Sequence, residues 1–263
     1  MRYVDDWFVN KNIRIHDNYT LLKLTLKKEI PEMLPGQFVQ VRVDNSPSTF
    51  LRRPISIHYV DKQANELWLL IQIVGDGTLW LAKSQTGDII NLIYPLGNGF
   101  SLPEEIFASK DKNKKLLLVG GGVGVAPLLF LGAHLSSIGY KPQFLLGAKS
   151  QKDLLQIEEF RKYGAVFTTT EDGSCGEKGL VTNHSVLKSN TFDYLYVCGP
   201  KQMMVAVAKY ARRHSILGEV SLENVMACGI GVCLCCVEKT IYGNQCVCTE
   251  GPIMNINTLT WQI

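Results

Sequence analysis

The sequence has little excess charge of either sign, and charged residues are sparse. Its 263 residues include 27 Lys and Arg against 24 Asp and Glu, a formal net charge of +3, and these four types make up 19% of the chain. A nucleic-acid-binding protein presents a strongly basic face with aromatic side chains among its cations. We therefore do not expect nucleic acid as a partner.

An apolar secretion signal is also missing, and no segment reads as a membrane span. The first residues, MRYVDDWFVN, carry Asp5 and Asp6 where a signal peptide would be apolar, so we expect a cytoplasmic protein. One run of 18 residues without charge, 116–133, contains five glycines and Pro127. That composition favours a buried strand, a glycine turn and a helix over a bilayer-spanning helix, so no membrane is expected as a partner.

Two changes of pattern divide the chain into three parts. Residues 1–104 contain short apolar runs separated by turn signals, which is typical of an antiparallel β-barrel. Residues 105–222 alternate strand-like and helix-length segments, which predicts an α/β domain with a parallel sheet. Residues 223–263 are rich in Gly and Cys and too few to fold alone without a metal. The sequence thus predicts a β plus α/β protein with a small C-terminal metal-binding segment.

The α/β part carries two features of a nucleotide site. Its first strand runs into the turn GGGVGVAP, where glycines let a phosphate approach the N–H groups at the start of a helix. A later strand, YLYVCGP, ends in Cys-Gly-Pro at the sheet edge where open α/β sheets bind ligands. A strict G-x-G-x-x-G is not met, because Val125 replaces the third glycine. Together the two features still predict a nicotinamide nucleotide site. Its candidate residues are Gly120, Gly121, Gly122, Gly124, Cys198, Gly199 and Pro200.

The N-terminal part carries two weaker motifs, RRPIS and VGDGT. In the first, Arg53 is suited to a bidentate contact with a pyrophosphate, and the Ser56 hydroxyl is suited to the edge of a flavin ring. In the second, the Thr78 hydroxyl and the start of a short helix, predicted at 78–84, would face a phosphate. Taken singly, each motif also fits an ordinary solvated strand or turn.

Six of the eight cysteines lie between residues 228 and 248. Four of them have the spacing C-x4-C-x2-C-x11-C, which is the plant-type pattern for a [2Fe–2S] cluster. Zinc is the main alternative, but zinc sites usually pair their ligands in two short knuckles, and no histidine follows His214. Gly229 and Gly231 also fit a loop that turns its N–H groups toward sulfur. Cys235 and Cys246 are left without a predicted role.

In sequence order, the segments RRPIS, GDGT, GGGVGVAPL, TEDGSCGEKGLVT, YVCGP, ENVMACGIGVCLCC and CVCTEGP carry a family resemblance over nearly the whole chain. The chain resembles the electron-transfer subunits of NAD-dependent (class 1B) dihydroorotate dehydrogenases, a branch of the ferredoxin reductase superfamily. The resemblance implies that the barrel binds FAD, the α/β domain NAD, and the C-terminal segment a [2Fe–2S] cluster. It assigns FAD contacts to Arg53, Pro54, Ile55, Ser56, Leu70, Ile71, Gln72, Gly77 and Thr78, and cluster ligands to Cys228, Cys233, Cys236 and Cys248.

The same resemblance implies a role within a larger enzyme. A separate FMN-containing catalytic subunit would oxidise dihydroorotate in pyrimidine biosynthesis, and electrons would pass through the cluster and FAD of this chain to NAD+, within a heterotetramer. FAD is the necessary converter, because a nicotinamide takes a hydride and a [2Fe–2S] cluster takes single electrons. No residue of this chain is expected to touch dihydroorotate, so none is assigned as catalytic.

Two other functions stay open. One is a reductase subunit of a hydrogenase, sulfite reductase or ferredoxin–NADP transhydrogenase, with the same cofactors and another partner. The other is a non-enzymatic metal-binding module. The preference for NAD over NADP is inherited from the family, and Lys149, Ser150 and Lys152 follow a strand where a 2′-phosphate would sit.

Overall fold

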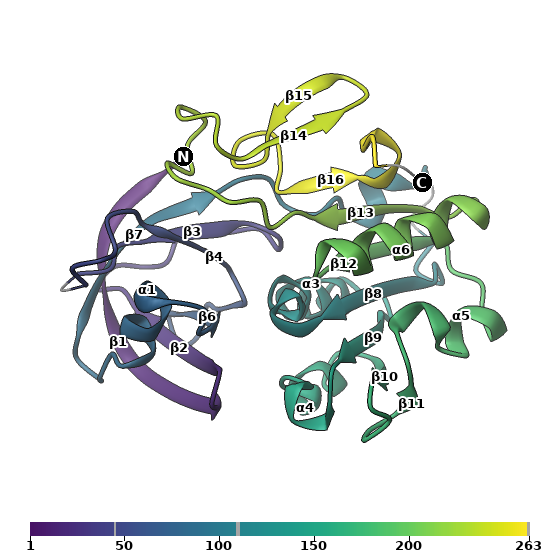
Figure 1. Ribbon diagram of the computed structural model, residues 1–263, viewed down its shortest axis with the longest axis horizontal. Helices are drawn as coiled ribbons and strands as arrows, with labels where there is room; N and C mark the ends of the chain where they lie inside the picture. The colour runs from purple at the N-terminus through teal and green to yellow at the C-terminus, as the bar shows by residue number, and fades with distance from the viewer. Residues whose placement is uncertain (45, 109–110, 262–263) are drawn as a thin grey trace. The chain divides into compact units, whose positions relative to one another are not determined.

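The computed structural model describes residues 1–44, 46–108 and 111–261. The chain forms two compact units (Figure 1). Residues 1–99, 224–238 and 244–252 belong to the first unit. Residues 100–223, 239–243 and the chain from 253 onward belong to the second. The cysteine-rich segment after residue 223 therefore contributes residues to both units.

The first unit is built on a seven-stranded antiparallel sheet with the order β4-β3-β7-β1-β2-β6-β5. Its strands are β1 (Tyr3–His16), β2 (Tyr19–Thr25), β3 (Phe38–Val41), β4 (Arg53–Ser56), β5 (Tyr59–Asp61), β6 (Glu66–Gln72) and β7 (Ile89–Leu96). The strands β1, β2 and β6 each contribute fully buried apolar side chains, among them Trp7, Leu22 and Leu69. The sheet curls into a half-barrel, in agreement with the predicted antiparallel barrel.

The short helix of this unit, α1 (Asp76–Ala82), starts two residues before the predicted 78–84. The Thr78 hydroxyl explains the difference, because it accepts hydrogen bonds from the N–H groups of Val74 (2.9 Å) and Gly75 (3.2 Å). It also donates to the Gly75 carbonyl (3.0 Å). A side chain that satisfies free backbone groups at a helix start lets the helix begin earlier.

The second unit is built on a seven-stranded sheet with the order β11-β10-β9-β8-β12-β13-β16. Its strands are β8 (Leu116–Gly121), β9 (Gln143–Ala148), β10 (Ala165–Thr170), β11 (Glu177–Lys178), β12 (Tyr194–Cys198), β13 (Leu217–Ser221) and β16 (Ile253–Asn255). All pairs are parallel except β13 with β16, which is antiparallel. The predicted parallel-sheet α/β fold is confirmed.

The strands of this second sheet lie side by side in Figure 1, and the helices of the unit precede them or lie between them in the chain. The helices are α2 (Pro103–Ile106), α3 (Ala126–Ser137), α4 (Ile157–Arg161), α5 (Val186–Ser189) and α6 (Lys201–Arg213). Helix α6 buries Met204, Val207, Ala208 and Ala211, which recur at the spacing of one helix face. Among the described residues, no helix is long and apolar enough to cross a bilayer.

The order of this sheet contains a reversal that matters for binding. From β8 the chain runs outward through β9, β10 and β11, and it then returns to place β12 on the other side of β8. Open α/β sheets bind ligands beyond the carboxyl ends of the strands at such a reversal. The fold therefore marks the ends of β8 and β12 as a ligand site.

The cysteine-rich segment has little regular structure. It contains a two-stranded sheet of β14 (Val237–Thr240) and β15 (Gly243–Cys246). Four of its cysteines lie in the turns between residues 228 and 236, which contain no helix or strand.

Candidate functional site

The strand β4 carries the RPIS motif at one edge of the antiparallel sheet. It pairs with β3 through Val41 opposite Arg53 and Phe38 opposite Ser56. All four residues, Arg53, Pro54, Ile55 and Ser56, are half-buried. Proline is tolerated at a sheet edge, where its missing N–H breaks no ladder. The free edge of β4 leaves backbone and side-chain groups available to a ligand.

The two motifs of the N-terminal part meet in space. A β-carbon built at Gly77 would lie 2.8 Å from Nε of Arg53, so the guanidinium packs directly against the first turn of α1. Nη1 of Arg53 donates to the carbonyls of Leu51 (3.1 Å) and Arg52 (3.4 Å). Within the described ranges, Arg53 has no carboxylate partner. Its charge thus remains available for a phosphate.

The neighbouring Arg52 is engaged in the sheet. Its guanidinium donates to the carbonyls of Gln40 (3.2 Å) and Asn91 (3.1 Å) and to Oδ1 of Asn91 (2.6 Å). Burial lowers the pKa of Arg52 below its usual value. The two arginines of RRPIS therefore have different surroundings, one structural and one open to a ligand.

The other predicted flavin contacts are less accessible than the sequence implied. The side chains of Leu70 and Ile71 are buried in the core, and Gln72 is half-buried. β5 pairs with β6 only as far as Trp68, so the backbone of 70–72 has no strand partner on that side among the described residues. The Thr78 hydroxyl is committed to its own turn, as described above. Contacts of these residues with a flavin would therefore use mainly the backbone.

The glycine turn and the Cys-Gly-Pro strand end meet in the second unit. Cys198 of β12 lies opposite Gly120 of β8. A β-carbon built at Gly124 would lie 2.4 Å from the α-carbon of Gly199, so the two turns touch through their backbones. Pro200 lies just beyond, close to Gly121. The predicted nicotinamide residues are thus brought together at the reversal of the sheet.

One acidic residue at this edge was missed in the sequence. Glu223 follows β13, and Sγ of Cys198 donates to its Oε1 at 3.8 Å. Burial raises the pKa of both the Cys198 thiol and the Glu223 carboxyl, even though Glu223 keeps an exposed surface. The available signal was its position two residues after a buried strand at the carboxyl edge. Sequence alone did not establish that β13 lies next to β12.

The cysteine loop turns backbone N–H groups toward its sulfurs. Sγ of Cys228 accepts from the N–H groups of Ile230 and Cys233, both at 3.4 Å. Sγ of Cys248 accepts from Gly231 (3.1 Å), and Sγ of Cys236 accepts from Cys248 (3.4 Å). Such donors stabilise thiolates, the form that binds metal. The N–H of Ile230 is the main cause that lowers the pKa of Cys228 well below that of a free thiol.

The four predicted ligands fall into two pairs. The Cys233 thiol donates a hydrogen bond to Cys228, and the thiols of Cys248 and Cys236 are hydrogen-bonded to each other. Burial, followed by this hydrogen bond, raises the pKa of Cys248. Cys236 and Cys248 are 2% and 1% exposed, whereas Cys233 is exposed and Cys228 half-buried. Two cysteines for each of two irons is the arrangement that a [2Fe–2S] cluster requires.

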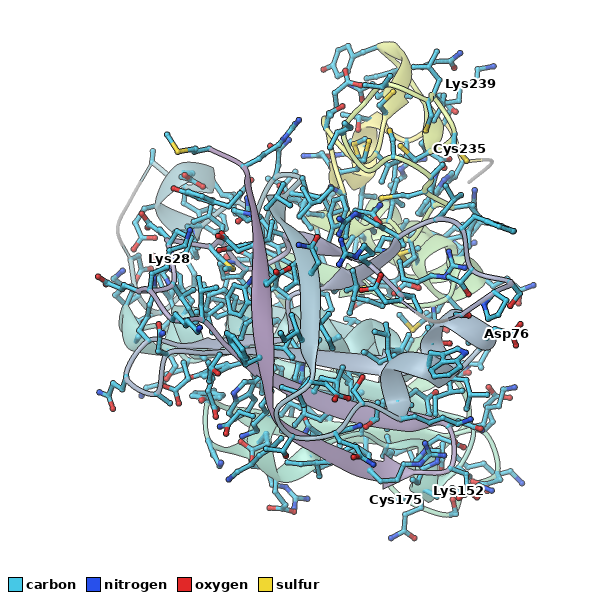
Figure 2. All side chains as sticks on the ribbon, turned by 90° about the vertical axis from the view of Figure 1, so that its left-hand side faces the viewer. Lys28, Asp76, Lys152, Cys175, Cys235 and Lys239 are labelled. Carbon is cyan, nitrogen blue, oxygen red and sulfur yellow. The ribbon has the colours of Figure 1, made fainter. Side chains whose placement is uncertain are left out.

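The remaining cysteines of the segment differ from these four. Figure 2 labels Cys235 in the yellow segment, where the sulfur-coloured sticks gather, and its side chain is exposed. Cys246 is half-buried, and partial burial together with the nearby charge of Cys236 raises its pKa. In the described part of the chain, no three His, Cys, Asp or Glu side chains converge on one metal ion.

Two family models match this chain. The model of the iron–sulfur cluster binding domain of dihydroorotate dehydrogenase B matches residues 223–260. The model of the oxidoreductase NAD-binding domain matches residues 118–209. Together with the antiparallel flavin-type sheet, they define the chain as an oxidoreductase of the ferredoxin reductase type with an iron–sulfur segment.

Curated relatives and solved structures narrow this class. The dihydroorotate dehydrogenase B (NAD(+)) electron transfer subunit of Shouchella clausii is 38% identical over 246 residues, which cover 91% of either chain. The same subunit of Fusobacterium nucleatum is 37% identical and covers 95% of this chain and 96% of its own. The chain therefore belongs to the family of dihydroorotate dehydrogenase B electron transfer subunits, and the predicted family is confirmed.

Solved structures share the fold. The structure of an NADH-dependent reduced ferredoxin-NADP oxidoreductase, described for flavin-based electron bifurcation, matches with a TM-score of 0.85 at 26% identity, over 97% of this chain and 90% of its own. The cytochrome b5 reductase domain of Ulva prolifera nitrate reductase has a TM-score of 0.67 at 14% identity, over 81% of this chain and 94% of its own. The second likeness concerns the fold alone.

Proposed function

We propose that this chain carries electrons from a separate FMN-containing, dihydroorotate-oxidising subunit to NAD+, in pyrimidine biosynthesis. The single observation that carries the proposal is that one chain contains both a set of four paired cysteines and a glycine-lined nucleotide site at the carboxyl ends of β8 and β12. Membership of the family supplies the substrate and the partner. A heterotetramer in the cytosol is part of the proposal, with an FAD domain at 1–104, an NAD domain at 105–222 and a cluster segment at 223–263.

The residues have distinct roles in this proposal. Cys228 and Cys233 would hold one iron of the cluster, and Cys236 and Cys248 the other. Arg53 would bind the FAD pyrophosphate beside Gly77, and Ser56 the edge of the ring. When bound, FAD supplies the exchange between single electrons and a hydride. The glycine turn from Gly120 to Gly124 would hold the NAD pyrophosphate at the end of β8.

The Cys198–Glu223 pair would shape the nicotinamide pocket together with Gly199 and Pro200. Burial raises the pKa of the Cys198 thiol and of the Glu223 carboxyl. The role of the pair would be to position the nicotinamide and exclude water from the pocket.

The surface near Cys228 and Cys233 suits a protein partner. Val225, Val232 and Leu234 are 79%, 76% and 64% exposed, and all three lie in the cysteine segment. Exposed apolar side chains gathered in one segment are typical of an interaction site. We infer that the catalytic subunit docks here, next to the half-buried Cys228 and the exposed Cys233.

The likeness to the ferredoxin-NADP oxidoreductase keeps a second candidate in view, a reductase subunit with a different electron partner. Co-expression with a dihydroorotate-oxidising subunit separates the two. We expect a stable complex that reduces NAD+ with dihydroorotate, and a Cys248→Ser control that forms the complex without this activity. A stable complex of the unmodified chains with no such activity would refute the favoured function.

A further inference from the structure

Gln40 is a buried polar side chain whose amide has no partner. It lies in the middle of β3, opposite Pro54 of β4, and is 0% exposed. Its backbone carbonyl accepts from Arg52, but within the described part of the chain neither Nε2 nor Oε1 of its side chain makes a hydrogen bond. Buried amide groups are nearly always hydrogen-bonded, because losing water without a replacement costs free energy. The Gln40 amide is therefore placed to meet a group that binds this chain.

The amide lies against the cysteine loop. A β-carbon built at Gly229 would be 2.5 Å from Nε2 of Gln40, 2.7 Å from its Cγ and 3.0 Å from its Cδ. Gly229 directly follows Cys228, and its φ of +70° also favours glycine. The loop and β3 thus approach as closely as a glycine allows, with the amide nitrogen at the contact. A larger residue at 229 would push the Gln40 amide away from the loop at this point.

Backbone N–H groups supply hydrogen-bond donors to only some of the four predicted cysteine ligands. The N–H groups of the loop already reach Sγ of Cys228, Cys236 and Cys248. The bridging sulfides of a [2Fe–2S] cluster would add further acceptors among these thiolates. An uncharged N–H donor next to Cys228 is the group that such acceptors require. No charged side chain would have to be buried to provide it.

We propose that Gln40 donates a hydrogen bond from its side-chain amide to the sulfur of the cluster at the Cys228 end, and thereby raises the reduction potential of the cluster. This inference rests on the proposed cluster function. Reduction adds negative charge to the sulfurs, so a donor stabilises the reduced form more than the oxidised form. Gln40 is accordingly a positioning and tuning residue, and it is not a ligand.

The direct test uses the unmodified, cluster-loaded chain labelled with 15N at glutamine side chains. Pulsed EPR on the reduced cluster should detect a hyperfine coupling from a side-chain 15N, and the coupling should disappear in Gln40→Met. Methionine keeps the length of the side chain and removes the donor. Absence of any side-chain 15N coupling in the unmodified chain would overturn the proposal, whether or not the variant folds.

A redox titration followed by EPR provides the second measurement. Gln40→Met should shift the cluster potential to a lower value and leave the FAD potential unchanged. Gln37→Met is the matched control, because the Gln37 side chain is satisfied by the Gly97 carbonyl (2.9 Å) and the Leu34 N–H (2.8 Å). A shift of the FAD potential alone, or equal shifts in both variants, would contradict the assignment. An unmodified chain that never holds a cluster would refute the proposed function itself.

Discussion

The two arginines of RRPIS allow a test of the flavin site in which one substitution should affect FAD binding and the other should affect stability. Arg53 faces the turn of α1 and has no carboxylate partner among the described residues, whereas Arg52 makes three hydrogen bonds within the sheet. We expect Arg53→Ala to weaken FAD binding and to leave the apoprotein stable. We expect Arg52→Ala to destabilise the apoprotein and to affect FAD binding less.

The magnitudes follow from the contacts. A charge-assisted hydrogen bond contributes about 1.5–3 kcal/mol, so Arg53→Ala should raise the Kd for FAD by about one to two decades. Arg52→Ala removes donors from two backbone carbonyls and from Oδ1 of Asn91. Leaving such groups unsatisfied should lower the free energy of unfolding by about 1–3 kcal/mol.

Two assays on both variants measure these quantities. Titration of the apoprotein with FAD, followed by quenching of flavin fluorescence, gives the Kd. Urea denaturation of the apoprotein gives the free energy of unfolding. Equal losses of FAD affinity in the two variants, with equal stabilities, would contradict the assignment of Arg53 to the pyrophosphate. Arg53→Lys should fall between the unmodified chain and alanine, because lysine keeps the charge but not the bidentate geometry.

Three further predictions concern the other sites. Cys248→Ser should abolish or shift the visible and EPR spectra of the cluster while Cys246→Ser leaves them intact, and the opposite result in anaerobically purified protein would mean that the fourth ligand is misassigned. Gly124→Ala places a methyl group on the backbone of Gly199, so steady-state kinetics should show a KM for NADH raised about tenfold or more at unchanged flavin content, and an unchanged KM would argue against a nucleotide at this turn. Val225→Glu should weaken binding to the catalytic subunit in analytical ultracentrifugation without loss of the cluster, and unweakened binding would place the interface elsewhere.

The sequence was most informative where chemistry depends on local spacing. The strand, glycine turn and helix at 116–137 lie within one continuous segment, so a glycine pattern was enough to place them. The cysteine spacing likewise restricts which sulfurs reach one cluster. Both the fold class and the family could be predicted from such local patterns.

Contacts between distant segments were not predictable in this way. Glu223 reaches Cys198 only because β13 pairs with β12, and Gln40 meets Gly229 across 189 residues of sequence. The hydrogen bonds that the Thr78 hydroxyl accepts from the N–H groups of Val74 and Gly75 were not predictable for a related reason, since they depend on the exact turn geometry. Burial of Leu70 and Ile71 also depends on neighbouring strands.

The passage of the cysteine-rich segment through both units limits how this protein can be cut or recombined. After the last predicted ligand, Cys248, the chain continues into β16, which closes one edge of the parallel sheet by pairing with β13. A fragment ending at residue 222 would leave β13 as a bare edge strand, open to pairing with other chains. The iron-binding part is thus not a detachable cassette, and fragments or chimaeras made from this family need the final strand to travel with the nucleotide sheet.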